Sequence, residues 1–207
     1  MSTARPLVLV AGAGAGLGQA LLARFETAGF TPVGLGRSQP NQTVGEFHTL
    51  DLADEAAVQA TVADVMAHHG PPKVVIHNAA ELKIAPFEDT QPGDFQRTWS
   101  SMVLSAVVLA RATITPMVDA GGGSYIVSGA TASIRGGARF AAFASAKFAL
   151  RGLTQSLARE YQPAGVHVCH VILDGIIDSE KSRVLHGLGP SKMMQTKAIA
   201  EAYLQIA

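Results

Sequence analysis

The sequence predicts an α/β fold built on a parallel β-sheet. Short runs rich in β-branched residues alternate along the chain with longer stretches that have the 3.6-residue period of helices. This alternation is typical of parallel strands joined by crossover helices. The 207 residues, 48% of them hydrophobic, suffice for one continuous core, and no linker or internal repeat interrupts the pattern. We therefore expect residues 1–207 to form one domain.

Six strands and five helices account for the alternation. Glycine follows three of the helices as a stop signal, and residues 180–191 are short and rich in glycine and proline, so we expect only a small, mobile cover there. The strands are expected at residues 7–11, 31–36, 46–50, 73–78, 124–128 and 166–173, and the helices at residues 17–28, 54–69, 92–118, 137–161 and 193–206.

Charge and cysteine content exclude several classes of protein. Lys and Arg together number 16, as do Asp and Glu, so the formal net charge of zero indicates no surface for nucleic acid or an anionic membrane. Residues 1–6 do not combine a basic region with a long apolar stretch, so we expect no signal peptide and no membrane span. Cys169 is the single cysteine, which excludes internal disulfides and favours a reducing, cytoplasmic setting. His167 and His170 lie three apart on an expected strand and so point to opposite faces, and we expect no metal site.

A glycine-rich turn connects the first expected strand to the first expected helix. Gly12, Gly16 and Gly18 have the spacing G-x-x-x-G-x-G. Glycines at such a turn let the backbone approach a pyrophosphate, whose charge the N–H groups of the helix start stabilise. A flexible turn without a ligand is the alternative, but the strand before it and the helix after it favour a dinucleotide site.

The end of the second expected strand bears on the choice between NAD(H) and NADP(H). An acidic side chain at this point would accept hydrogen bonds from a ribose 2′-OH, whereas a 2′-phosphate needs a cation. Gly36 takes the acidic position here, and Arg37 and Ser38 follow it with a guanidinium and a hydroxyl. NADP(H) is therefore favoured over NAD(H), with a solvated surface arginine as the alternative.

These motifs resemble those of the short-chain dehydrogenase/reductase superfamily. The glycine motif, Asp51 after the third strand and the segment His77-Asn78-Ala79-Ala80 after the fourth occur in the family's order along almost the whole chain. His77 and Ala80 depart from the family's N-N-A-G pattern, and Ala11 stands where threonine is usual. The resemblance implies a three-layer, doubly wound Rossmann sheet with strand order 3-2-1-4-5-6.

The resemblance also implies the set of cofactor contacts. The family usually continues into a seventh strand where this chain stops, so either the sheet has six strands or a terminal segment is absent from the sequence. The residues implied to bind the cofactor are Gly12, Gly16, Leu17, Gly18, Arg37, Ser38, Asp51, Leu52, Asn78, Ala79, Ala80, Lys147, Gly175, Ile177 and Ser179.

The family's catalytic Asn, Ser, Tyr and Lys are only partly present. Lys147 fits the lysine of a Y-x-x-x-K motif, but Phe143 stands four residues before it, and phenylalanine has no proton to donate. The family spacing places Ala130 at the serine position and Met102 at the asparagine position. Lys147 is the one member retained, and we expect it to orient the nicotinamide ribose rather than to be an ordinary exposed lysine.

Other side chains could supply a proton. Thr131 could do so if the loop is one residue out of register, and Ser128 only if it shares the cleft face of its strand. Asp174 replaces the proline of the family's Pro-Gly pair, although an aspartate that closes a strand is more often a turn former. Asp174 would need a raised pKa to act as an acid. The segment from Gly175 through Ile177 to Ser179 resembles the one that holds the nicotinamide carboxamide.

The sequence thus predicts an NADP(H)-dependent oxidoreductase of a divergent branch, acting on a small carbonyl or alcohol with an impaired catalytic set. General acid–base catalysis contributes roughly 10²–10⁴-fold, so its loss weakens hydride transfer without abolishing it. A non-catalytic NADP(H)-binding sensor or partner subunit is the alternative. The helices at residues 92–118 and 137–161 resemble the pair that forms the family's dimer interface, so we expect a homodimer or homotetramer.

Overall fold

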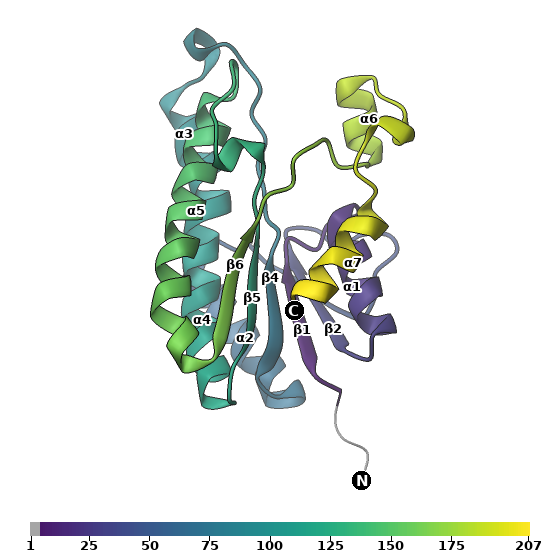
Figure 1. The fold of residues 1–207 in the computed structure, drawn as a ribbon, viewed down its shortest axis with the longest axis vertical. Coiled ribbons are helices and arrows are strands. Elements are labelled where there is room, and N and C mark those ends of the chain that lie inside the picture. Colours follow the sequence, from purple (N-terminus) through teal and green to yellow (C-terminus); the bar gives the residue numbers. More distant parts are fainter. Residues whose placement is uncertain (1–4) are drawn as a thin grey trace.

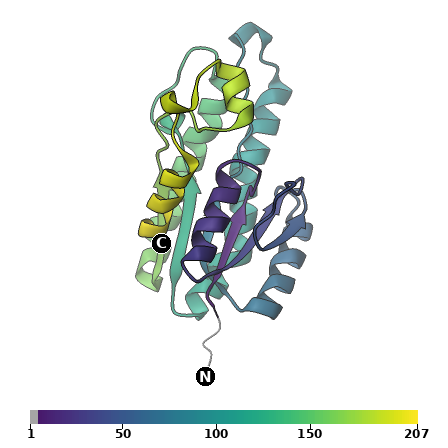
Figure 2. The same ribbon diagram turned by 90° about the vertical axis from the view of Figure 1, so that its right-hand side faces the viewer.

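A computed structural model describes residues 5–207. Within them six parallel strands form one sheet in the order β3-β2-β1-β4-β5-β6, which confirms the predicted order. Helices cover both faces of the sheet (Figures 1 and 2). Residues 1–4, which carry part of the signal-peptide expectation, lie outside the described residues. The strands are β1 (Leu7–Ala11), β2 (Thr31–Gly36), β3 (Glu46–Thr49), β4 (Pro72–His77), β5 (Gly123–Ser128) and β6 (Val166–Val171).

The two faces of the sheet are covered by different helices (Figure 1). Strand β1 is buried along its whole length, which explains its continuous run of apolar residues. Val8 and Val10 pack on the side of one helical layer, while Leu9 packs on the other, because successive side chains on a strand point to opposite faces. One layer holds α1 (Leu17–Thr27) and α7 (Thr196–Ile206), and the other holds α2 (Glu55–His69), α4 (Ser105–Asp119) and α5 (Ala141–Tyr161).

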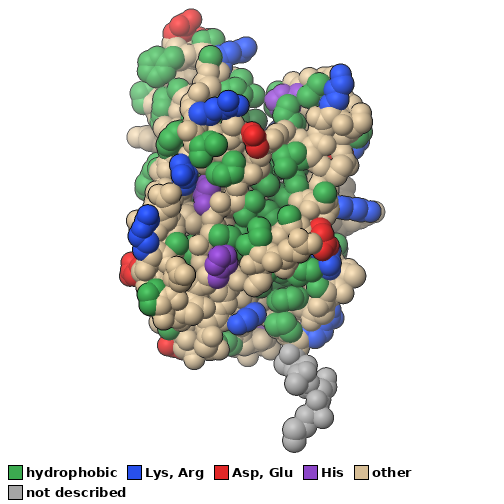
Figure 3. Space-filling view, in the orientation of Figure 1, with side chains coloured by type: hydrophobic (Ala, Val, Ile, Leu, Met, Phe, Trp, Pro, Cys, Tyr) green, Lys and Arg blue, Asp and Glu red, His purple; other side chains and the backbone are tan. Residues whose placement is uncertain are grey.

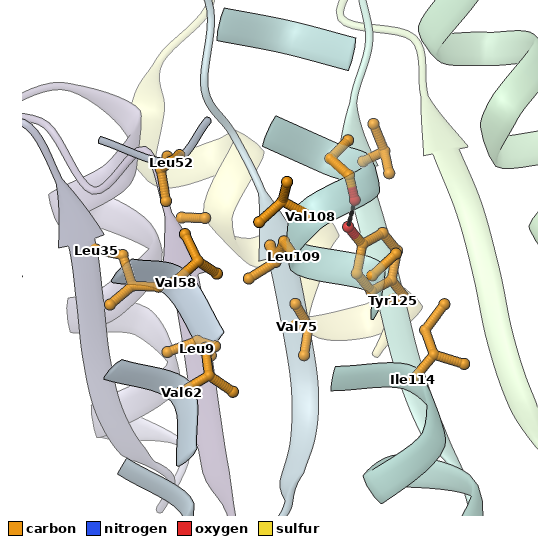
Figure 4. Close-up of a cluster of buried hydrophobic side chains, with 14 of the residues drawn as sticks. Leu9, Leu35, Leu52, Val58, Val62, Val75, Val108, Leu109, Ile114 and Tyr125 are labelled. Atoms are coloured by element: carbon orange, nitrogen blue, oxygen red, sulfur yellow. Dashed lines mark hydrogen bonds between the residues drawn. The ribbon is translucent and has the colours of Figure 1, made fainter. Parts of the chain in front are cut away.

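The larger core lies between the sheet and helices α2, α4 and α5 (Figure 4). Leu9 of β1 and Val75 of β4 are fully buried there together with Val58 of α2. Tyr125 of β5 is also fully buried, and its hydroxyl donates to the carbonyl oxygen of Ala106 at 2.9 Å. A buried phenol needs such a partner, so this hydrogen bond fixes α4 against β5.

The helix expected at residues 92–118 is divided in the structure. Helix α3 (Pro92–Trp99) passes into one wider, π-helical turn at Ser100–Leu104 before α4 begins. The whole segment Pro92–Asp119 is long and apolar enough to cross a membrane by length and composition alone. However, 56% of its most apolar stretch is buried within the molecule, which is the environment of a core helix.

Two further elements differ from the sequence prediction. Helix α5 begins at Ala141 rather than at residue 137, because Arg139 adopts a left-handed φ of 70° and its carbonyl oxygen accepts a hydrogen bond from the amide of Ala85 at 3.0 Å. A short helix, α6 (Glu180–His186), forms where no helix was predicted. The hydroxyl of Ser179 caps it by accepting a hydrogen bond from the amide of Ser182 at 3.1 Å. Seven residues are too few for a clear helical period.

The carboxyl ends of the parallel strands meet at one edge of the sheet, and ligands bind at this edge in doubly wound folds. It lies at the top of Figure 1, below α3 and α6. The space-filling view shows a notch between the part of the molecule that carries α3 and the part that carries α6 (Figure 3). Hydrophobic side chains gather on the surface below this notch. The predicted motifs all follow the carboxyl ends of strands, so the fold brings them to this edge.

Candidate cofactor site and catalytic positions

The glycine turn leaves open space at the start of α1. A Cβ added at Gly14 would meet nothing within 4 Å, and one added at Gly16 would approach only the Cβ of Ser179, at 3.7 Å. No side chain caps the N-terminus of α1. N–H groups at an uncapped helix start and a backbone without side chains are what a phosphate requires, so this turn fits a dinucleotide.

Two other glycines in the turn are needed for close packing. Gly12 has a φ of +85°, and a Cβ there would lie 2.5 Å from the amide nitrogen of Ala79. A Cβ at Gly18 would lie 2.5 Å from the Cα of Ala13. The side-chain amide of Asn78 also donates to the carbonyl oxygen of Gly12 at 3.1 Å. The glycine motif and the segment after β4 therefore form one wall.

A hollow of about 290 Å³ lies beside this wall. The connections after β1, β2, β3 and β4 all contribute to it, together with one residue of the π-helical turn. Most of the residues predicted for the adenosine half of the cofactor therefore share one cavity, while Gly14, Gly36 and Ser101 line it without having been predicted as contacts. The lining residues are Gly12, Gly14, Gly36, Arg37, Ser38, Asp51, Leu52, Asn78, Ala79, Ala80 and Ser101.

The positive charge of Arg37 lies near a carboxylate that no sequence motif predicted. Its side chain is 69% exposed, and one guanidinium nitrogen lies 3.9 Å from Oε2 of Glu81. Glu81 also accepts a hydrogen bond from the hydroxyl of Ser101 at 2.8 Å and lies 3.8 Å from Nε of Arg97. No motif marks Glu81, because only the folded chain brings the residue after Ala80 next to the end of β2.

Lys147 is buried, with 2% of its surface exposed, and is not an ordinary surface lysine. Its ammonium donates to the carbonyl oxygen of Ser128 at 2.7 Å and lies 5.7 Å from the centre of the Phe143 ring. Burial lowers the pKa of Lys147 from 10.5 to about 8. The helix thus holds a desolvated cation behind the end of β5.

Ser128 lies at the end of β5 with its hydroxyl hydrogen-bonded inside the fold. Its hydroxyl donates to Oδ1 of Asn78 at 2.9 Å and lies 2.8 Å from the hydroxyl of Tyr203 on α7. Ile126, two residues earlier on β5, packs in the core beside α1 and α7, so Ser128 shares that face. A role of Ser128 as a proton donor stays a prediction from the sequence, and its hydroxyl lies on the face of β5 that packs toward α1 and α7. Tyr203 lies in no recognisable motif and was missed.

His77 stands at the position of the first asparagine in the family's N-N-A-G pattern. It is fully buried, and its Nε2 lies 2.8 Å from the hydroxyl of Ser105, which itself donates to the carbonyl oxygen of Ser101 at 2.7 Å. Nε2 of His77 is therefore the donor, and Nδ1 is left as a buried nitrogen without a hydrogen-bond partner. Burial lowers the pKa of His77 to about 3, so the ring is neutral.

Thr131 and Asp174, the two suggested substitute groups, are brought together. Thr131 follows β5 and Asp174 follows β6, and the threonine hydroxyl donates to Oδ1 of the aspartate. Met102 is fully buried in the π-helical turn, and Phe143 packs against the larger core. Ala130 is half-buried. The structure thus brings the two groups that the sequence suggested as substitutes into direct contact.

The segment predicted to hold the nicotinamide lies close to the glycine turn but outside the hollow. Ile177 forms a parallel bridge with Met194, and a Cβ at Gly175 would lie 3.0 Å from Cγ of Met194. Ser179, the cap of α6, faces Gly16. Lys147 also lies outside the hollow, so the predicted set divides into an adenosine part and a nicotinamide part.

Known proteins share both the sequence pattern and the fold. The family profile described as short chain dehydrogenase matches residues 6–185. The 3-oxoacyl-(acyl-carrier-protein) reductase of Pseudomonas aeruginosa is 26% identical over 196 residues, which are 89% of this chain and 79% of that enzyme. A short-chain dehydrogenase from Rhodopseudomonas palustris has a structure with a TM-score of 0.80 and 32% identity, covering 97% of this chain and 90% of that one. The chain belongs to the short-chain dehydrogenase family.

Membership confirms the predicted superfamily and makes the protein an oxidoreductase by descent. A gluconate 5-dehydrogenase from Burkholderia cenocepacia J2315, solved in complex with NADP and tartrate, has the same fold with a TM-score of 0.87 at 18% identity, covering 98% of this chain and 88% of that one. The chain spans between 64% and 67% of the length of three other curated dehydrogenases that it matches. The replacement of the catalytic residues stays a prediction from the sequence.

A pair of alanine substitutions tests the glycine turn. Gly12→Ala should destabilise the fold by roughly 1–3 kcal/mol or more, because the new Cβ meets the backbone of Ala79 at a positive φ. Gly14→Ala should leave the free energy of unfolding within roughly 1 kcal/mol of the parent and weaken nucleotide binding, because its Cβ enters open space. Chemical unfolding and nucleotide titration measure the two effects. Equal stability of the two variants would contradict the packing argument.

Proposed function

We propose that this protein binds NADP(H) at the hollow and the glycine turn, and uses it to interconvert a small alcohol and its carbonyl compound. The observation that carries the proposal is the convergence of four strand-end connections on one cavity next to an uncapped helix start. The gluconate 5-dehydrogenase with the same fold was solved with NADP. Bound NADP(H) would exchange a hydride with the substrate carbon.

Each part of the site has a separate role in this proposal. Arg37 and Ser38 bind the 2′-phosphate, and Asp51 contacts the adenine. Asn78 fixes the wall through its hydrogen bond to Gly12. Lys147 orients the nicotinamide ribose from its buried position behind β5.

Thr131 and Asp174 provide a route for the proton. In alcohol oxidation the substrate carbon gives its hydride to the cofactor, and the hydroxyl must lose a proton. In this proposal Thr131 accepts that proton and passes its own to Asp174, and the hydrogen bond that its hydroxyl donates to that carboxylate supports the route. In carbonyl reduction the same pair returns a proton to the carbonyl oxygen.

A non-catalytic NADP(H)-binding protein is the second candidate. The observation that favours it is the apolar character of the family's catalytic positions, since Met102 is fully buried and Phe143 packs into the core. Neither side chain can donate a proton. Such a protein would respond to the NADPH level or serve as a partner subunit.

Restoring the family's residues distinguishes the two candidates. The double variant Phe143→Tyr and Ala130→Ser should raise hydride transfer by roughly 10²–10⁴-fold, because it adds a general acid and its partner beside Lys147. The parent and the variant are assayed with NADPH and a broad panel of carbonyl compounds. Tight NADPH binding without turnover in both proteins would favour the non-catalytic candidate, and slow turnover in the parent would favour the enzyme.

Cofactor preference is tested at Arg37. Arg37→Asp should reverse the preference toward NAD(H), because a carboxylate repels the 2′-phosphate and accepts hydrogen bonds from a 2′-OH. Arg37→Lys is the matched control, which keeps the charge but not the fork of donors, and should retain a reduced preference for NADP(H). Fluorescence titration of NADPH and NADH measures both. Equal affinities of the parent for NADPH and NADH would contradict the proposed preference for NADP(H).

We also propose that the protein is a homodimer or homotetramer in a cytoplasmic setting. A groove of about 350 Å³ runs between α4 and α5 and is lined by Val107, Ala110, Arg111, Ile114, Thr115, Leu153, Leu157 and Tyr161. These helices are the pair that the family resemblance assigns to subunit contact. Light scattering at micromolar concentration should give the mass of at least two chains, and a strictly monomeric mass would refute the assembly.

A further inference from the structure

His170 of β6 joins the strand to the turn that follows β5. Its Nε2 lies 2.9 Å from the hydroxyl of Ser133, and its Nδ1 lies 3.3 Å from the hydroxyl of Thr154 on α5. Ser133 is fully buried, Thr154 is 2% exposed, and the imidazole is partly buried between them. No motif assigned a role to any of the three side chains.

The neighbouring hydrogen bonds determine which nitrogen carries the proton. The hydroxyl of Thr154 donates to the carbonyl oxygen of Leu150 at 2.7 Å, so toward the ring it can only accept. Nδ1 of His170 must therefore be the donor. The neutral ring then has a bare Nε2, which accepts the proton of the Ser133 hydroxyl.

The turn after β5 is built against this ring. The hydroxyl oxygen of Ser133 accepts a hydrogen bond from the amide of Ala130 at 3.1 Å, which closes the turn on itself. A Cβ at Gly129 would lie 2.3 Å from Nε2 of His170, so only glycine lets the backbone pass the ring. Two residues after Gly129 lies Thr131, whose hydroxyl donates a hydrogen bond to Asp174.

We propose that His170 is a positioning residue whose Nδ1–H tautomer, held between Thr154 and Ser133, fixes the turn that presents Thr131 to Asp174. The hydrogen bonds run in one direction, from the amide of Ala130 through Ser133 to the ring, and from the ring through Thr154 to α5. The catalytic part of the inference rests on the proposed oxidoreductase function, whereas the tautomer and the fixed turn do not.

The ring stays neutral over the ordinary range of pH. Burial, together with the smaller effect of the positive charges of Lys147 and Arg151 on α5, lowers the pKa of His170 from 6.5 to about 4. Protonation would turn Nε2 of His170 into a donor, so the Ser133 hydroxyl could no longer donate to it. The Ser133 oxygen already accepts a hydrogen bond from the amide of Ala130. Because the folded-state pKa lies below the ordinary value of 6.5, stability from the neutral ring falls as pH drops from 6.5 toward 4.

Ring ¹⁵N NMR of the whole chain tests the tautomer without any substrate. The signal that disappears in His170→Gln identifies this ring, which should show the Nδ1–H form and no titration between pH 5 and 8. Thr154→Ser keeps the acceptor and should preserve that form, whereas Thr154→Val removes the acceptor and should lose it. An Nε2–H ring in the parent would overturn the proposal, even if a variant fails to fold.

Hydrogen exchange and kinetics test the consequence. Thr154→Val alters a side chain that bonds to the ring and not to the turn, yet amide exchange at residues 130–133 should rise at least 10-fold. Ser156→Ala, which removes an exposed hydroxyl on α5, is the matched control and should leave that exchange unchanged. Unchanged exchange in Thr154→Val would overturn the positioning role.

If the parent protein catalyses hydride transfer, Thr154→Val should lower kcat at least 10-fold. The KM for the nicotinamide cofactor should change less than 2-fold. Thr154→Ser should restore most of the kcat. If Thr154→Val raises the amide exchange at residues 130–133 but keeps the kcat of the parent, catalysis does not need the fixed turn. That outcome contradicts the catalytic part of the proposal. Absence of turnover in the parent with the predicted tautomer and exchange would count against the proposed function alone.

Discussion

The close contact between the backbone at Gly12 and the segment after β4 is the constraint on which the rest of the site depends. At this point two connections approach so closely that no side chain fits between them. Asn78 completes the contact by donating to Gly12 and accepting from Ser128, whose hydroxyl in turn pairs with Tyr203 of α7. One line of hydrogen-bonded polar groups therefore ties the glycine turn to β4, β5 and the last helix.

A second group of polar side chains lies behind the end of β5, where we propose that the nicotinamide binds. Lys147 is held by the carbonyl oxygen of Ser128, while His170 fixes the turn that carries Thr131. Neutral rings at His77 and His170 add no positive charge near the lysine. The structure thus keeps the supports of the site, and in our proposal Thr131 and Asp174 act in place of the proton donors that the sequence predicts to be replaced.

Several parts of the site could not be predicted because they depend on contacts across the fold. Glu81, Ser101 and Tyr203 lie in no motif, and they reach Arg37, the hollow and Ser128 only after the strands have assembled. The role of Ser128 was left open because the sequence gives the alternation along a strand but not which face a catalytic group shares. Helix α6 was missed because its seven residues rely on the cap at Ser179.

The sequence by itself determined the alternation of strands and helices, the strand order through the family motifs, and the residues of the glycine turn. These are properties of local periodicity and of backbone conformations that only glycine adopts readily, so they can be read from neighbouring residues. The tertiary structure decided the burial of Lys147, the balance between Arg37 and Glu81, the meeting of Thr131 with Asp174 and the tautomer of His170. Each depends on distances between strand ends and helices far apart in the chain, which packing of the two cores sets.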